Sequence, residues 1–246
     1  MKTRRTIITG DRGFIGGHLF GRLHCDPRFE AAEFDRNAFS SAERLAAKLD
    51  GCQVAVHLAG MSRSDDGDRL YRVNIKLAET LAAALTSLPA ARRPALFFGS
   101  TTHIAKNTPY HASKRDAQAL FERAGLDVTT LLMPNVFGPY SRPFFNSVVS
   151  TFCRMAADGA TPERIDDAEL KLIDVFSLNN IIAEMIWEHK PDTPAAAVNI
   201  PHRFTLRLPE LWNKLLVMAG RRSGSIPADS EFDRLLYAAY SSYLNH

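Results

Sequence analysis

The chain has 246 residues, of which 46% are hydrophobic and 23% are charged, and its 14 glycines and 13 prolines are spread along its length. This composition is typical of a globular protein and excludes a collagen-like or largely disordered one. Lys and Arg total 30 against 27 Asp and Glu. Because these charges form no basic run, the sequence gives no support to nucleic-acid binding.

The cysteines and the N-terminus indicate where the protein works. Cys25, Cys52 and Cys153 are odd in number and lack metal-ligand spacing, so neither a disulfide framework nor a metal site is expected. The apolar run behind the basic N-terminus stops at Gly10, too short for a signal-peptide core or a membrane helix. We therefore expect a cytoplasmic protein with no membrane partner.

Short apolar runs alternate with longer stretches of helical period. The predicted strands are Thr6–Thr9, Glu33–Asp35, Val54–Leu58, Leu96–Gly99 and Val128–Met133. The predicted helices are Phe14–His24, Ala42–Leu49, Arg69–Leu88, Tyr110–Ala124, Asn146–Ala157, Asn179–His189, Leu208–Ala219 and Glu231–Tyr240. Alternating strand and helix predicts an α/β fold with a Rossmann-type, doubly wound parallel sheet.

The alternation breaks after Met133, where prolines and glycines crowd together and irregular segments separate the remaining helices. We interpret this part as a small C-terminal lobe. The expected division assigns residues 1–133 and 168–200 to the sheet domain, and residues 134–167 and 201–246 to the lobe.

The first predicted strand runs into the turn Thr9-Gly10-Asp11-Arg12-Gly13-Phe14-Ile15-Gly16. Glycines at this spacing permit a tight turn, close approach of the backbone to a pyrophosphate and close helix packing, and the following helix offers unpaired N–H groups. Asp35 follows Gly16 by 19 residues, at the predicted end of the second strand. This order predicts a dinucleotide site.

The choice between the two nicotinamide cofactors depends on three residues. Asp35 could accept the adenine ribose hydroxyls of NAD, whereas Arg12 and Arg36 could hold the 2′-phosphate of NADP. The two arginines favour NADP(H) over NAD(H), although surface charge would explain them as well.

Tyr110 and Lys114 are four residues apart at the start of a predicted helix, so their side chains are expected to be neighbours. An adjacent ammonium is expected to lower the Tyr pKa toward neutrality, which suits proton transfer to or from a sugar or alcohol oxygen. The preceding strand ends in hydroxyls, of which Thr101 is expected to hold the reacting oxygen, with Ser100 and Thr102 as alternatives. His57 is expected to be a packed histidine.

The chain resembles the extended short-chain dehydrogenases/reductases, of the NAD-dependent epimerase/dehydratase type, that act on nucleotide sugars. The matching pieces are Thr9–Gly16, His57–Gly60, Asn74, Tyr110–Lys114 and Pro134–Pro139. The resemblance implies that the sheet domain binds NAD(P) and that the lobe binds substrate. It also implies a homodimer formed through the helices Arg69–Leu88 and Tyr110–Ala124, with Ala78, Leu81, Ala82, Ala83 and Leu85 in or beneath the interface.

Two features narrow the resemblance: the short interval from Thr101 to Tyr110, and the segment from Arg142 to Cys153. Both are similar to the reductase half of bifunctional capsular-polysaccharide enzymes that reduce a UDP-4-keto-6-deoxy-N-acetylhexosamine. In those enzymes a cupin domain follows, whereas this sequence stops at His246. A stand-alone reductase and a chain cut at the domain boundary both remain open.

The motifs and the resemblance together give a set of expected site residues. The expected catalytic residues are Thr101, Tyr110 and Lys114. The expected cofactor-binding residues are Gly10, Arg12, Gly13, Phe14, Ile15, Asp35, Arg36, Leu58, Ala59, Gly60, Asn74, Ser100, Tyr110, Lys114, Pro134 and Val136. The expected substrate-binding residues are Thr102, Asn135, Arg142 and Asn146, while Phe137, Phe144 and Phe145 are expected in the core.

The expected function is NAD(P)H-dependent reduction of the C4 keto group of a UDP-activated 6-deoxy-amino sugar in polysaccharide biosynthesis. Two alternatives stay open. One is a redox-neutral 4-epimerase that keeps NAD bound, and the other is a dinucleotide-binding module without catalysis.

Overall fold

The computed structural model describes residues 3–190, 193–220 and 230–244, and these form two compact units. The first unit comprises residues 1–133 and 179–200, and the second comprises residues 134–178 and 201–246. Residues 168–178, which the sequence assigned to the sheet domain, group with the second unit, because the strand they contain pairs there. The functions expected of the two parts remain predictions.

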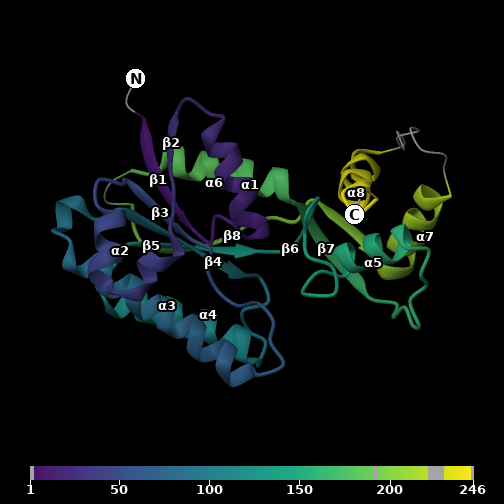
Figure 1. Cartoon of the computed structure of the whole chain (residues 1–246), viewed down its shortest axis with the longest axis horizontal. Helices are drawn as coiled ribbons and strands as arrows, with labels where there is room; N and C mark the ends of the chain where they lie inside the picture. Colours follow the sequence, from purple (N-terminus) through teal and green to yellow (C-terminus); the bar gives the residue numbers. More distant parts are fainter. Residues whose placement is uncertain (1–2, 191–192, 221–229, 245–246) are drawn as a thin grey trace. The chain divides into compact units, whose positions relative to one another are not determined.

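A six-stranded parallel sheet forms the centre of the first unit, in the order β2-β1-β3-β4-β5-β8 (Figure 1). Its strands are β1 (Arg4–Thr9), β2 (Phe29–Ala32), β3 (Val54–His57), β4 (Ala95–Thr101), β5 (Val128–Met133) and β8 (Ala196–Asn199). Every neighbouring pair is parallel. The predicted doubly wound α/β fold is confirmed.

Helices cover both faces of this sheet (Figure 1). On one face lie α2 (Ala42–Leu49), α3 (Gly67–Ser87) and α4 (Pro109–Arg123), whose apolar residues share a buried cluster with the strands. On the other face lie α1 (Phe14–His24) and residues 179–188 of α6 (Val175–Glu188). Short 3-10 turns at Arg36–Ser40 and Ala90–Arg92 complete the unit.

The sequence misplaced the second strand of this unit and did not predict β8. Glu33–Asp35 was predicted, but β2 ends at Ala32, because its register pairs Phe29 with Arg4 and Ala32 with Ile7 of β1. Asp35 instead begins the first 3-10 turn, where its side chain accepts a hydrogen bond from the Asn37 amide. An aspartate in this role ends a strand rather than extending it.

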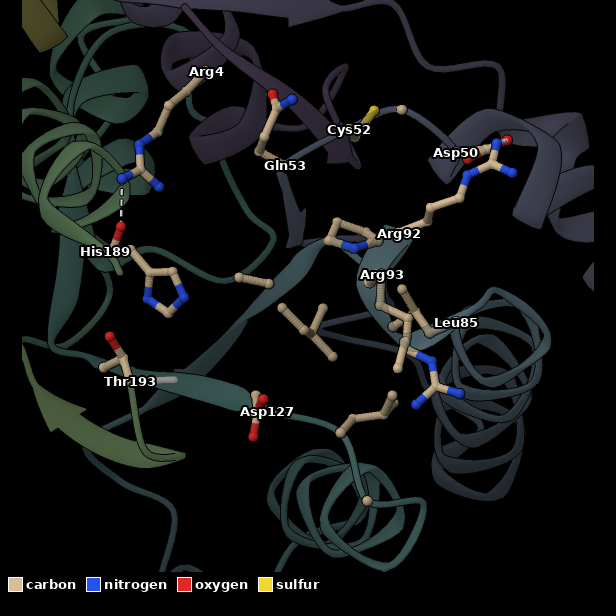
Figure 2. A pocket seen from close by; sticks show the side chains of 18 of the residues that line it. Arg4, Asp50, Cys52, Gln53, Leu85, Arg92, Arg93, Asp127, His189 and Thr193 are labelled. Atoms are coloured by element: carbon tan, nitrogen blue, oxygen red, sulfur yellow. Dashed lines mark hydrogen bonds and ion pairs between the residues drawn. The ribbon is translucent and has the colours of Figure 1, made fainter. Parts of the chain in front are cut away.

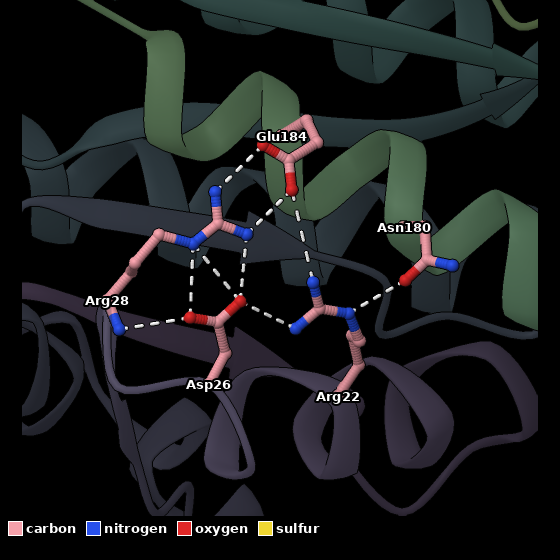
Figure 3. Close-up of polar contacts among 5 residues, drawn as sticks. All are labelled: Arg22, Asp26, Arg28, Asn180 and Glu184. Atoms are coloured by element: carbon pink, nitrogen blue, oxygen red, sulfur yellow. Dashed lines mark hydrogen bonds and ion pairs between the residues drawn. The ribbon is translucent and has the colours of Figure 1, made fainter.

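A network of charges fastens α1 and β2 to α6 (Figure 3). Asp26 accepts hydrogen bonds from Arg22 at 2.8 Å and from Arg28 at 2.8 Å. Arg28 also contacts both carboxylate oxygens of Glu184, at 2.6 and 2.8 Å, and Arg22 donates to Asn180 at 2.7 Å. Two arginines thus bridge acceptors from segments far apart in the sequence.

Most of the α3 residues expected at a dimer interface belong to the core of the first unit. Ala78, Leu81, Ala82 and Leu85 are at most 6% exposed, and Ala83 is exposed. The homodimer remains a prediction, and of these five only Ala83 offers surface to a second chain.

The second unit contains a three-stranded sheet in the order β6-β7-β9, made of Asn135–Phe137, Glu169–Asp174 and Phe204–Arg207. Its helices are α5 (Val148–Ala157), α7 (Leu208–Ala219) and α8 (Glu231–Ser241), together with the first turn of α6. Phe137, Trp212 and Tyr240 belong to its apolar core. The sequence predicted the three helices but none of these strands. Among the described residues, no helix is long and apolar enough to cross a bilayer.

Candidate active site

The glycine turn is as tight as the sequence predicted. Gly10 has a φ of +83°, and a Cβ there would lie 2.7 Å from the Ala59 amide nitrogen. A Cβ on Gly16 would lie 2.1 Å from the Gly10 carbonyl oxygen, and the Gly13 amide donates to that same oxygen at 2.9 Å. Side chains at positions 10 and 16 would therefore fill the space between the end of β1, the start of α1 and the end of β3.

The first turn of α1 presents its amides at this place. The first N–H groups of an α-helix have no intrahelical acceptor. Because the cap residue is Gly13, they receive no side-chain acceptor either. Phe14 and Ile15 are half-buried, and Arg12 is exposed. Backbone N–H groups at a helix N-terminus suit the oxygens of a pyrophosphate.

Asp35 and Arg36 are both exposed, three and four residues beyond the end of β2. One carboxylate oxygen of Asp35 is already used by the Asn37 amide at 2.9 Å. The choice between a ribose hydroxyl and a 2′-phosphate therefore stays a prediction at these two residues and Arg12.

Asn74 connects the loop after β3 to α4. Its Oδ1 accepts from the Met61 amide at 2.7 Å, and its Nδ2 donates to the Met61 carbonyl and to the Ser113 hydroxyl, each at 2.9 Å. Ser113 in turn donates to the Tyr110 carbonyl at 2.7 Å. Because both polar atoms of this buried amide are bonded to the protein, Asn74 shapes the loop that carries Gly60.

Lys114 and Tyr110 are neighbours on α4, as predicted. The Lys114 ammonium donates to the Gly99 carbonyl at 2.8 Å and lies 5.9 Å from the centre of the Tyr110 ring. Lys114 is buried and Tyr110 is half-buried. The two side chains therefore meet at the carboxyl end of β4, the edge of a parallel sheet where ligands bind.

The expected pKa of Tyr110 is corrected by the structure. Burial raises the pKa of Tyr110 above its ordinary value, instead of the ammonium lowering it. Burial also lowers the pKa of Lys114 to about 8. Desolvation disfavours the charged form of each group, so Tyr110 is a protonated phenol at neutral pH and suits the role of proton donor.

The hydroxyls at the end of β4 differ in their surroundings. Ser100 Oγ is buried without a hydrogen-bond partner among the described residues. Thr101 is half-buried and its hydroxyl accepts from the His103 amide at 3.1 Å, while Thr102 is exposed. Together with the glycine cradle, the unpartnered Ser100 hydroxyl fits a polar ligand laid along this edge, as a dinucleotide would be.

His57 is a packed histidine, as expected. Its Nδ1 lies 2.7 Å from the Thr9 hydroxyl, its ring stacks on Phe98, and burial lowers its pKa to about 3. Leu58 and Ala59, which follow it, are half-buried.

The expected residues of the second unit are Pro134, directly before β6, and residues of β6 and of the loop after it. Pro134 is buried, Val136 is half-buried and Asn135 is exposed. Arg142 and Asn146 are also exposed, and the Arg142 guanidinium lies 4.8 Å from the centre of the Phe145 ring. The structure leaves untested which of these contact a ligand.

The aromatic residues of that unit separate into two groups. Phe137 is a core residue, 1% exposed, as predicted. Phe144 is not, because it is 60% exposed and has a φ of +55°. A bulky side chain rarely adopts this left-handed backbone conformation.

Sequence reasoning missed Phe98, whose ring lies 4.8 Å from the Lys114 ammonium. Its signal was present in the sequence, since Phe98 directly precedes the Gly99 and Ser100 that were singled out. Phe98 becomes relevant to the site because Lys114 is buried against its ring.

A cavity of about 1050 Å³ lies away from all these residues, at the amino ends of β1, β3 and β4 (Figure 2). Arg4, Gln53 and Arg93 are among the residues that line it. None of the expected site residues lines this cavity, so it is not the candidate active site.

Comparison with known proteins decides the family. The model of the NAD dependent epimerase/dehydratase family matches residues 6–171. The chain belongs to this family. The family is described as NAD dependent, so the cofactor that it indicates is a nicotinamide dinucleotide.

One curated relative of this family member is the UDP-2-acetamido-2,6-beta-L-arabino-hexul-4-ose reductase of Pseudomonas aeruginosa, which is 27% identical over 98% of the chain. The chain spans 65% of that relative's length. The capsular polysaccharide assembling protein CapF of Staphylococcus aureus is 26% identical, with a TM-score of 0.73 over 98% of this chain and 65% of its own.

The fold is also shared with RMD from Pseudomonas aeruginosa, whose structure was solved in complex with NADPH. Its TM-score is 0.79 and its identity 19%, over 98% of this chain and 100% of its own. At that identity the likeness concerns the fold alone.

Proposed function

We propose that the protein reduces the C4 keto group of a UDP-linked 6-deoxy-amino sugar with NAD(P)H, preferring NADPH, in the cytoplasmic synthesis of a polysaccharide. The observation that carries the proposal is the pairing of Tyr110 with Lys114 at the carboxyl end of β4, in a chain similar to a 4-keto-sugar reductase.

The proposed chemistry assigns one task to each group. The bound dinucleotide supplies the hydride that adds to the carbonyl carbon. Tyr110 donates its phenolic proton to the carbonyl oxygen, and the Thr101 hydroxyl holds that oxygen by a hydrogen bond. The Lys114 ammonium stabilises the tyrosinate that remains and binds ribose hydroxyls of the cofactor. A half-buried, protonated phenol is suited to donating this proton.

The remaining expected residues fit a division of binding tasks. The turn Gly10–Gly16 and the start of α1 would hold the pyrophosphate, and Ser100 would add a hydroxyl to the cofactor site. Thr102, Asn135, Arg142 and Asn146 would bind the nucleotide sugar. A guanidinium suits paired phosphate oxygens, which favours Arg142 for the diphosphate.

The experiment that tests this function is a reaction of the purified protein with NADPH and a UDP-4-keto-6-deoxy-N-acetylhexosamine in deuterated water. We expect one NADPH oxidised per sugar reduced at C4, with no deuterium at C3 beyond a control without enzyme. The reason is that, in the part of the chain that the structure describes, Tyr110 is the one acid/base group assigned to the site, and it serves the carbonyl oxygen.

The same reaction separates the alternatives. A 4-epimerase would interconvert UDP sugars without net oxidation of NADPH, using NAD that remains bound. A binding module would bind NADPH and leave the sugar unchanged. Either result would overturn the proposed reductase.

A further inference from the structure

Lys114 is a buried cation without a carboxylate partner among the described residues. It is 8% exposed, and it contacts the Gly99 carbonyl at 2.8 Å, the Phe98 ring at 4.8 Å and the Tyr110 ring at 5.9 Å. Burying an ammonium is costly unless other groups stabilise its charge. A carbonyl dipole and the face of an aromatic ring are the groups that the protein provides here.

Phe98 is held rigidly in this position. It is 1% exposed, its ring meets that of Phe121 edge-on at 5.3 Å, and it stacks on the His57 ring at 5.8 Å with an interplanar angle of 18°. His57 is itself fixed by the Thr9 hydroxyl at 2.7 Å. The Phe98 ring therefore has little freedom to move away from the ammonium.

We propose that Phe98 is a positioning residue of the active site, whose ring face keeps the Lys114 ammonium charged and in place beside Tyr110. The role of Lys114 in the reaction is taken from the proposed function, and to that extent this proposal rests on it. The interaction between the ring and the cation does not depend on it.

The other groups around Lys114 are neutral, so they do not mask the effect of the Phe98 ring on its charge. On β3, His57 is neutral because burial lowers its pKa to about 3, and on α4, Tyr110 is neutral because burial raises its pKa. β4 carries no titratable side chain, and α3 approaches through the neutral Asn74–Ser113 pair. With the pKa of Lys114 lowered to about 8 by burial, a modest stabilisation of the cation decides its charge near neutral pH.

The strand offers a matched control in Phe97. Phe97 and Phe98 are adjacent in β4 and equally buried, at 1% exposure each. Because side chains alternate along a strand, Phe97 lies on the other face, where its ring contacts His189 at 5.5 Å. Phe97→Leu thus removes a ring of the same size from the same strand without touching Lys114.

The test measures the protonation of Lys114 directly, by NMR of protein labelled with carbon-13 at the lysine ε-carbons. The Lys114 resonance is assigned by its loss in Lys114→Met. We expect Phe98→Leu and Phe98→Met to weaken proton binding by Lys114 roughly 3- to 30-fold, a range that spans exposed and desolvated cation–π contacts, and Phe97→Leu to change it less than twofold.

Two results would overturn the inference: the same protonation of Lys114 in both Phe98 variants as in the unmodified protein, or an equal shift in Phe97→Leu. Using two substitutions of different shape guards against a variant that fails to fold. Failure of the proposed function would show separately, as a lack of turnover by the unmodified protein, and would leave the NMR result standing.

Discussion

The hydroxyl of Thr9 lies 2.7 Å from Nδ1 of His57, joining the last residues of β1 and β3 in a buried contact. His57 is 2% exposed and stacks on Phe98. Burial keeps this imidazole neutral in the interior, next to the cation of Lys114, and so ties protein stability to pH.

We expect the protein to lose stability as the pH falls below about 6.5. Burial lowers the pKa of His57 to about 3 from an ordinary value of 6.5, so the unfolded chain binds a proton over this range and the folded one does not. The stability is complete above pH 6.5 and is lost toward pH 3, by about 2 kcal/mol at pH 5. Urea unfolding at several pH values checks this, and His57→Gln should flatten the dependence while exposed His202→Gln should not.

Gly16→Ala should damage both folding and cofactor binding, whereas Gly21→Ala in the same helix should not. The new Cβ at position 16 would lie 2.1 Å from a carbonyl oxygen, and that at position 21 would meet nothing within 4 Å. We expect a loss of at least about 1–3 kcal/mol for the first and a gain of about 0.5–1 kcal/mol for the second. Thermal unfolding and NADPH titration would measure the two effects, and equal behaviour of the variants would contradict the tight turn.

Tyr110→Phe should bind the cofactor normally and lose turnover by about 10²- to 10⁴-fold, because the ring remains and the proton donor is removed. Lys114→Ala should weaken both cofactor binding and turnover. Isothermal titration and steady-state kinetics separate the two effects. Near-normal turnover of Tyr110→Phe on the true substrate would mean that another group donates the proton.

NADPH should bind more tightly than NADH, because Arg12 in the turn and Arg36 after β2 are both exposed and could bind a 2′-phosphate. A charge-assisted hydrogen bond contributes about 1.5–3 kcal/mol, or roughly ten- to a hundredfold in affinity. Arg36→Ala should reduce the preference and leave kcat unchanged. Equal dissociation constants for the two cofactors in the unmodified protein would refute the assignment.

Asp26→Asn should cost about 1–3 kcal/mol of unfolding free energy, because Arg22 and Arg28 both donate to this carboxylate, which is 10% exposed. Those contacts hold the pKa of Asp26 well below its ordinary value, so their stabilisation is present above about pH 3.8 and is lost as the pH falls further. Glu184→Gln is the control and should cost less, since Glu184 is 48% exposed. Denaturant unfolding measures both.

Local sequence was enough for the glycine turn and for three helices whose ends match the structure: α1, α2 and α7. It was not enough for strands whose position is set by pairing with segments distant in the chain. β2 was misplaced because its position depends on pairing with β1. β6, β7 and β9 were not predicted because they form by pairing with one another, β7 with both β6 and β9. Periodicity alone does not reveal such pairings.

The candidate site shows the same limit. The spacing of Tyr110 and Lys114 correctly predicted that they are neighbours. It did not predict how deeply they lie, and burial reverses the expected shift in the pKa of Tyr110. The internal hydrogen bonds of Asn74 were missed for a related reason, since Met61 and Ser113 reach it only through the fold.

The pairing of β8 with β5 has a consequence for the order in which the chain folds during synthesis. When translation has reached Met133, every strand of the larger sheet except β8 has been made, and β5 is an open edge with unpaired backbone groups. The strand that covers this edge, β8, is made only after residues 134–195 have been synthesised. The first unit therefore cannot be completed until β8 has been made, and the nascent chain carries an exposed strand edge for the whole interval.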